Sequence, residues 1–187
     1  MISILIGTGF EEVEAITVYD ILKRGKLDVE LVSVTGGLVV SSARNLEIQC
    51  DSLLDDNDLT KQQLIVVPGG MGGVKRIISS PSAKDFLTKA MDRAIYIAAI
   101  CAGPLVLDKF KLLDGYKFTG YPGVQQEMEN TDTEKYYISD KNVVVDKNLI
   151  TSIGPGTAPE FAFKLLEILA GEEVLKQIYD NWWGNEN

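Results

Sequence analysis

The sequence predicts an α/β fold of the doubly wound type, in which helices cover both faces of a mostly parallel sheet. Short runs of β-branched and aliphatic residues recur along the chain without the polar alternation of a half-exposed strand. Such runs are typical of parallel strands buried on both faces. Helical patterns separate them, as the doubly wound arrangement requires. Strands are expected over residues 2–7, 29–34, 64–70, 95–101 and 149–154.

The segment EEVEAITVYDILKRG, residues 11–25, predicts the first helix. It carries apolar residues at Val13, Ile16 and Ile21, acidic residues in its first turn and basic residues in its last. This charge order complements the helix dipole, and Gly25 is a typical stop.

Two later helices have recognisable starts. Ser80 followed by Pro81 predicts an N-cap with proline at the first helical position. Thr157 with Glu160 three residues on has the pattern of a capping box, and the apolar helix that follows is expected to end at Gly171.

The stretch NVVVDKNLITSI, residues 142–153, predicts a β-hairpin that turns over residues 146–148. Its second half is the last of the predicted strands.

Four strands end in small residues that suit a binding site. These ends are GTG at 7–9, PGG at 68–70, CAGP at 101–104 and GPGT at 154–157. Open α/β sheets bind ligands outside the carboxyl ends of their strands, and glycine there permits close backbone approach. A functional site is therefore expected where these ends meet.

Size and composition restrict the classes of protein. The 187 residues, 45% of them apolar, are enough for a single domain, expected over residues 1–187. A formal charge of −9 argues against nucleic acid as a partner. No apolar run is long enough to cross a membrane, so we expect a cytoplasmic protein whose cysteines are thiols.

The chain contains no histidine. Within one chain this excludes Cys-His and Ser-His-Asp catalysis and zinc sites built on histidine. Any catalytic base must be Asp, Glu, Lys, Tyr or a thiolate. No dinucleotide or Walker A motif is present, so neither a nucleotide cofactor nor a metal is expected.

Cys101 lies in AAICAG, at the end of a predicted buried strand. A reactive side chain between small residues at a strand-to-helix turn is the pattern of a nucleophile elbow. The following helix, with Pro104 in its first turn, would present its N-terminus to the thiol and lower its pKa, making it a nucleophilic thiolate. The alternative is that Cys101 only fills the core, the interpretation that we prefer for Cys50 in its polar stretch.

Glu14 is the candidate acid, because it lies one turn inside the first helix, after a glycine-bearing loop. In a partly apolar cleft beside a thiolate, its pKa would be raised, and the protonated carboxyl could donate to the sulfur or shuttle protons. Alternatively, Glu14 only complements the helix dipole, as we expect of Glu11 and Glu12.

Backbone N–H groups at two strand ends are candidate oxyanion donors. The Gly69-Gly70 pair could supply one N–H and Ala102 a second. The alternative is an ordinary glycine turn.

Taken together, GFEEVEAITVYDILKRG, VVPGGMGG, AAICAGPLVL and TSIGPGTAPEFAFKLLEIL resemble the ThiJ/PfpI superfamily. The similarity is to the branch of the Parkinsonism-associated protein deglycase, over roughly residues 2 to 178. It implies a flavodoxin-like fold and a homodimer. Family activities include conversion of methylglyoxal to lactate without a cofactor, protein deglycation, redox sensing through cysteine sulfinate in oxidative stress, and chaperone behaviour.

The resemblance also implies roles for individual residues. Cys101 would be the elbow nucleophile in a strained backbone conformation, Glu14 the protonated carboxyl bonded to it, and Gly70 and Ala102 the oxyanion donors. Tyr121 would lie at the substrate pocket, and Arg24 and Arg44 would lie near the dimer interface beside that pocket.

Two positions depart from relatives in the superfamily. Tyr121 replaces a histidine of the deglycase; a phenol is a poor base at neutral pH, so Tyr121 is expected to orient a carbonyl. Ala102 stands where the protease members have a histidine, so a protease is not expected.

The leading hypothesis is a cofactor-independent cysteine enzyme of the glyoxalase III or deglycase type. Its substrates would be small α-oxoaldehydes or glycated proteins. The alternative is a redox sensor or stress-responsive chaperone whose Cys101 is oxidised to sulfinate. A third hypothesis is a stable fold without activity at this site.

Overall fold

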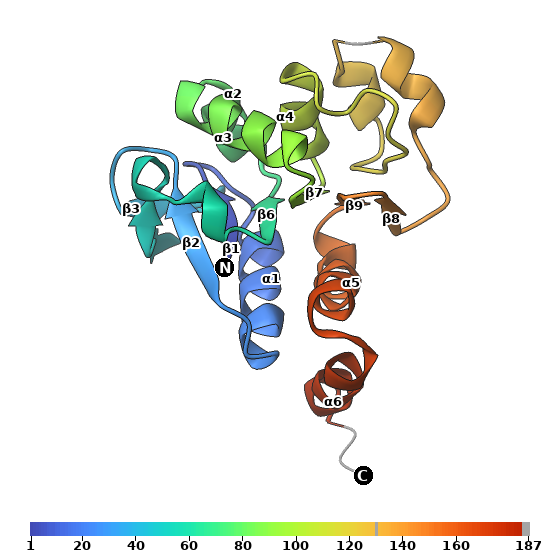
Figure 1. Cartoon of the computed structure of the whole chain (residues 1–187). Helices are drawn as coiled ribbons and strands as arrows, with labels where there is room; N and C mark the ends of the chain where they lie inside the picture. Colours follow the sequence, from blue (N-terminus) through green and yellow to red (C-terminus); the bar gives the residue numbers. More distant parts are fainter. Residues whose placement is uncertain (130, 185–187) are drawn as a thin grey trace.

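A computed structural model describes residues 1–129 and 131–184. In this part of the chain, seven strands form one sheet in the order β5-β2-β1-β6-β7-β9-β8, and pairing is parallel except between β8 and β9 (Figure 1). All five predicted strands are present: β1 (Ile2–Ile6), β2 (Val29–Ser33), β6 (Leu64–Val67), β7 (Tyr96–Ile100) and β9 (Leu149–Ser152). The predicted doubly wound, mostly parallel sheet is confirmed.

The predicted hairpin is also confirmed. β8 (Val143–Asp146) runs antiparallel to β9, and the register sets Asp146 opposite Leu149. Lys147 and Asn148 therefore make a two-residue turn, with Lys147 at φ 56. The short strands β3 (Val39–Ser41), β4 (Glu47–Gln49) and β5 (Ser52–Leu53) were not predicted, because they are two or three residues long and only partly buried.

Helices cover both faces of the sheet (Figure 1). On one face lie α1 (Glu12–Arg24) and α5 (Ala158–Ala170), followed by α6 (Glu172–Trp182); on the other lie α2 (Met71–Ile78), α3 (Pro81–Asp92) and α4 (Pro104–Lys109). Alternate residues of each strand join the two cores: Ile4 packs with the α1 and α5 side chains and Leu5 with those of α3 and α4. Within the described residues, no helix is both long and apolar enough to span a bilayer.

Both predicted helices begin where expected, after Ser80 and after Thr157, but only one of the two predicted side-chain caps is present. The Ser80 hydroxyl accepts a hydrogen bond from the Ala83 N–H (3.1 Å), so Ser80 is an N-cap. Thr157 makes no capping hydrogen bond to α5; its hydroxyl accepts from the Gly154 N–H (3.1 Å) instead. The reason is the tight turn over Pro155–Thr157, which directs the hydroxyl back to the end of β9.

The buried face of α1 differs from the apolar pattern of its sequence. Val13 and Ile16 are 46% and 36% exposed, whereas Glu14 is fully buried. Only Ile21 of the three predicted apolar positions reaches the core, where it lies with Val18. Burying a carboxyl in place of two apolar side chains is costly, and it indicates that the first turn of α1 serves a site.

Candidate active site

Cys101 lies at the end of β7 with a backbone φ of 62, in the left-handed region that costs a non-glycine residue about 1–3 kcal/mol. Hydrogen bonds hold this conformation from both sides. The Cys101 N–H donates to the Ser152 carbonyl (3.0 Å), and the Tyr121 N–H donates to the Cys101 carbonyl (2.9 Å). Gly103 permits the sharp turn, because a Cβ there would lie 2.5 Å from the Val67 carbonyl oxygen. The strand-to-helix elbow expected from the sequence is therefore present.

The glycine-bearing strand ends meet around this cysteine. A Cβ on Gly70 would lie 2.4 Å from the Gly9 carbonyl oxygen, so the first and second of these ends are in close contact. A Cβ on Gly154 would lie 3.8 Å from the Cys101 sulfur, so the strand end at 154–157 lies beside the one at 101–104. The four ends thus form one edge of the sheet, as predicted.

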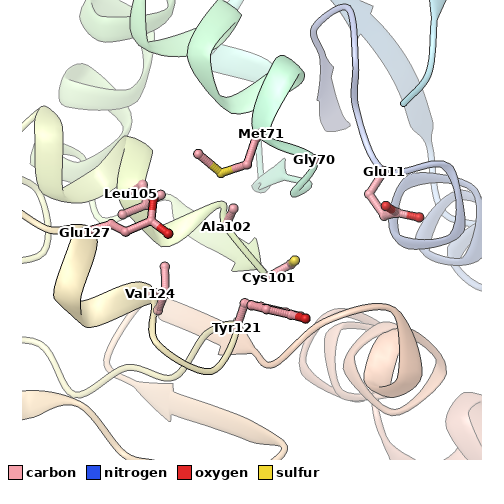
Figure 2. Close-up of a pocket in the computed structure, with 9 residues that line it drawn as sticks. All are labelled: Glu11, Gly70, Met71, Cys101, Ala102, Leu105, Tyr121, Val124 and Glu127. Carbon is pink, nitrogen blue, oxygen red and sulfur yellow. The ribbon is translucent and has the colours of Figure 1, made fainter. Parts of the chain in front are cut away.

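A pocket of about 270 Å³ opens in front of Cys101 (Figure 2). Its walls come from the strand ends, the first residues of α2 and α4, and the loop after α4. The lining residues are Glu11, Gly70, Met71, Cys101, Ala102, Leu105, Tyr121, Val124 and Glu127.

Glu14 lies on the first turn of α1, and its carboxyl adjoins the Cys101 thiol. Its Oε2 accepts a hydrogen bond from the Gly69 N–H (2.7 Å). Oε1 has no nitrogen or oxygen donor among the described residues, and the Cys101 thiol is the hydrogen-bonding group beside the carboxyl. Burial raises the pKa of Glu14 to about 7, although the Gly69 N–H and the Cys101 thiol both lower it. A carboxyl with this pKa can both give and take a proton near neutral pH.

Gly69 is what allows this approach. A Cβ at Gly69 would lie 2.7 Å from both the Cys101 Cβ and the Glu14 Oε2. The N–H of Gly69 is used by Glu14, so of the Gly69-Gly70 pair only the Gly70 N–H faces the sulfur, together with the Ala102 N–H. The two predicted donors therefore lie beside Cys101.

The pKa of Cys101 is raised to about 12, and the prediction of a lowered pKa was wrong. Burial is the largest cause, followed by the charge of Glu14 and its hydrogen bond with the thiol; the N–H groups of Ala102 and Gly70 lower the pKa. α4 has only six residues, and its N-terminus does not outweigh a buried carboxylate. Both the charge of Glu14 and its accepted hydrogen bond raise the pKa of Cys101 only while the carboxyl is ionised. Protonation of Glu14 removes both effects, so the thiol and the carboxyl titrate as a coupled pair.

Two of the three residues expected beside the pocket lie at or near it. Tyr121 lines the pocket, and its ring faces Gly154; a Cβ there would lie 3.5 Å from Tyr121 Cδ2. Arg44 does not line the pocket itself, but its guanidinium donates a hydrogen bond to Glu11 (2.7 Å), which does.

Arg24 is not at the pocket of this chain, and its expected position near a dimer interface stays a prediction. It lies at the opposite end of α1 from Glu14, about 15 Å along the helix axis. Its guanidinium pairs with Asp20 (2.8 Å) and lies over the ring of Trp182, 5.2 Å from the centroid.

Several lining residues were not predicted. Met71 and Leu105 begin the helices that follow two of the strand ends, so their positions could have been inferred from the elbow pattern. Val124 and Glu127 lie on a short 3-10 helix that no sequence pattern indicated. Within residues 1–129 and 131–184, no group of cysteine and acidic side chains is arranged to hold a metal ion.

Known proteins are similar to this chain in sequence and in fold. The sequence model of the DJ-1/PfpI family matches residues 1–168. Protein dj-1beta of Drosophila melanogaster is 38% identical, over 94% of this chain and 92% of its own. The glutathione-independent glyoxalase DJ-1 of Schizosaccharomyces pombe is 30% identical, over 95% of both chains. The structure of oxidized Toxoplasma gondii DJ-1 superposes with a TM-score of 0.88, with 30% identity and 97% of both chains covered.

Proposed function

Because the chain belongs to the DJ-1/PfpI family, we propose that it is a cofactor-independent cysteine enzyme that converts small α-oxoaldehydes, or their protein adducts, to 2-hydroxy acids. One observation carries the proposal. Cys101, in a left-handed elbow at the pocket, adjoins a buried Glu14 whose pKa is about 7. A nucleophile and a base within one hydrogen bond are what carbonyl addition without histidine needs.

The first step is addition of sulfur to the aldehyde carbon. Ionised Glu14 takes the proton of the Cys101 thiol as the carbon–sulfur bond forms and passes it to the aldehyde oxygen, giving a hemithioacetal. The Gly70 and Ala102 N–H groups, which face the sulfur, stabilise the negative charge that develops beside it. A preformed thiolate is not required, in agreement with the raised pKa of Cys101.

The second step moves a proton between the two carbons. Glu14 removes the proton of the former aldehyde carbon, which leaves an enediolate. The hydroxyl proton on that carbon moves to the neighbouring oxygen, and Glu14 returns the first proton to the neighbouring carbon. The former aldehyde carbon is oxidised and its neighbour reduced, so the product is a thioester of a 2-hydroxy acid. Water then hydrolyses the thioester and restores the Cys101 thiol. Tyr121, at the pocket wall, orients the second carbonyl by a hydrogen bond from its hydroxyl.

The test is lactate formation from methylglyoxal without glutathione. Wild type should form lactate, and Cys101→Ala should form none above the uncatalysed rate, while Cys50→Ala should match wild type. Equal rates for wild type and Cys101→Ala would refute the proposal.

A redox role for the same cysteine is the second candidate. Its supporting observation is that Cys101 lines an open pocket whereas Cys50 is 2% exposed. The relative from Toxoplasma gondii was solved in an oxidized form. Mild peroxide should add two oxygen atoms at Cys101 before Cys50 changes, as mass spectrometry of the peptides would reveal. Earlier oxidation of Cys50 would count against this role.

The expected homodimer has support on α1. Val13 and Ile16 are exposed apolar side chains on the helix that carries Glu14. Association through this surface would explain why they face outward.

A further inference from the structure

The pocket in front of Cys101 has an uneven charge. Glu11 and Glu127 line it, and no lysine or arginine among the described residues does. Figure 2 shows the two carboxylates on opposite sides, with Cys101 between them. The buried carboxyl of Glu14 is hydrogen-bonded to the Cys101 thiol. A ligand that reaches Cys101 therefore passes between negative groups.

The two lining carboxylates differ in their partners. Glu11 is paired with Arg44 (2.7 Å), and this cation compensates its charge from outside the pocket. Glu127, on the 3-10 helix Val124–Glu127, is exposed and makes no ion pair with any residue that the structure describes. Among the described residues, Glu127 is thus the carboxylate lining the pocket of Cys101 that has no paired cation.

Glu127 also lies where the pocket continues into a second hollow. This hollow, of about 240 Å³, shares Met71, Leu105 and Glu127 with the first. Its lining between α2 and α4 includes the apolar side chains of Val74 and Ile78. Charged side chains of both signs also line it: Lys75, Lys109, Asp108 and Glu129, of which Lys109 pairs with Glu129. A substrate with a group longer than a methyl attached to its carbonyl would extend past Glu127 into this space.

We propose that Glu127 determines the charge specificity of the site, so that carbonyl compounds bearing a guanidinium or ammonium group react faster at Cys101 than carbonyl compounds bearing a carboxylate. A carboxylate pairs with guanidinium through two parallel hydrogen bonds and repels α-keto carboxylates. The inference rests on the proposed function, in which the reacting carbonyl sits at Cys101.

The experiment uses charged thiol reagents, so that it does not depend on turnover. Cys101 attacks the sulfenyl sulfur of a methanethiosulfonate, methanesulfinate leaves, and a mixed disulfide forms. Rates are measured at low ionic strength with the trimethylammonioethyl and the sulfonatoethyl reagents, each divided by its rate with N-acetylcysteine. Peptide mass spectrometry assigns the modification to Cys101. The variants are Glu127→Gln, Glu127→Lys and, as a control with the same change of net charge, Glu173→Gln on α6, which does not line the pocket.

The ratio of the cationic to the anionic rate should fall about fivefold in Glu127→Gln and about thirtyfold in Glu127→Lys, as expected for a unit charge some ~8 Å from the ligand in water. Glu173→Gln should keep the wild-type ratio, and about 1 M salt should remove the differences. A ratio unchanged in Glu127→Gln, or lowered equally in Glu173→Gln, would overturn the proposal. Absence of lactate formation by wild type, with the ratio still dependent on Glu127, would refute the enzyme and leave the charge selection standing.

Discussion

The two cysteines of the chain differ less in their acidity than in what surrounds them. Burial raises the pKa of both thiols, to about 11 at Cys50, where Asp51 adds to the effect, and to about 12 at Cys101. Cys50 is enclosed between β4 and β5, 2% exposed. Cys101 sits in a left-handed turn at an open pocket, beside Glu14.

The difference between the two cysteines indicates that the pKa of a thiol does not by itself identify the reactive one. The distinguishing features of Cys101 are access to the pocket, a carboxyl able to take its proton, and backbone N–H groups that face the sulfur. Four predictions test this distinction.

The largest effect is expected from removing the base. Glu14→Gln should lower kcat/KM for methylglyoxal by about 10²–10⁴, the usual contribution of a positioned acid–base group. In wild type, kcat/KM should rise with pH through about 7, as Glu14 ionises, and this rise should be absent from the residual activity of the variant. Glu12→Gln, on the same turn but outside the pocket, is the control. An unchanged rate in Glu14→Gln would mean that Glu14 is not the base that takes the proton of Cys101.

Burial of Glu14 should also appear as a pH-dependent loss of stability. The folded-state pKa is raised from 4.5 to about 7, so folding is favoured while the carboxyl is protonated, and this stability is lost as the pH rises through about 7. Relative to Glu14→Gln, the free energy of unfolding of wild type should fall by about 3 kcal/mol between pH 4.5 and pH values above 7. Urea denaturation across this range measures it; parallel pH profiles would mean that Glu14 titrates normally.

Access should separate the two thiols when a neutral reagent is used. Iodoacetamide should alkylate Cys101 about a hundredfold or more faster than Cys50, because Cys50 reacts only after local opening of the structure. Peptide mass spectrometry over time gives both rates, and in denaturant they should become similar. Comparable rates in the folded protein would show that the pocket gives Cys101 no advantage.

A smaller effect is expected from the glycine between the two reacting groups. Gly69→Ala places a Cβ 2.7 Å from the Cys101 Cβ and the Glu14 Oε2, so the pair must separate, and kcat/KM should fall about tenfold or more. Gly156→Ala is the matched control at another strand end, because nothing lies within 4 Å of its Cβ. Equal activity of the two variants would indicate that close contact of Cys101 with Glu14 is unnecessary.

The features that depend on local pattern could be predicted from the sequence alone. Buried β-branched runs between helical segments predicted the five central strands and the hairpin, and small residues around Cys101 predicted its elbow. Order along the chain also brought Glu14 to the same edge of the sheet, because the carboxyl ends of parallel strands meet there.

How these groups act on one another depends on contacts between segments that are distant in the sequence. The pKa values of Glu14 and Cys101 depend on burial and charges contributed by several strand ends at once, which no local pattern contains. The outward turn of Val13 and the distance of Arg24 from the pocket follow from the orientation of α1 on the sheet. Glu127 reaches the pocket through an irregular loop, where sequence periodicity carries no signal. Local sequence sets backbone preference, whereas the electrostatics of a site are a sum over neighbours that only folding brings together.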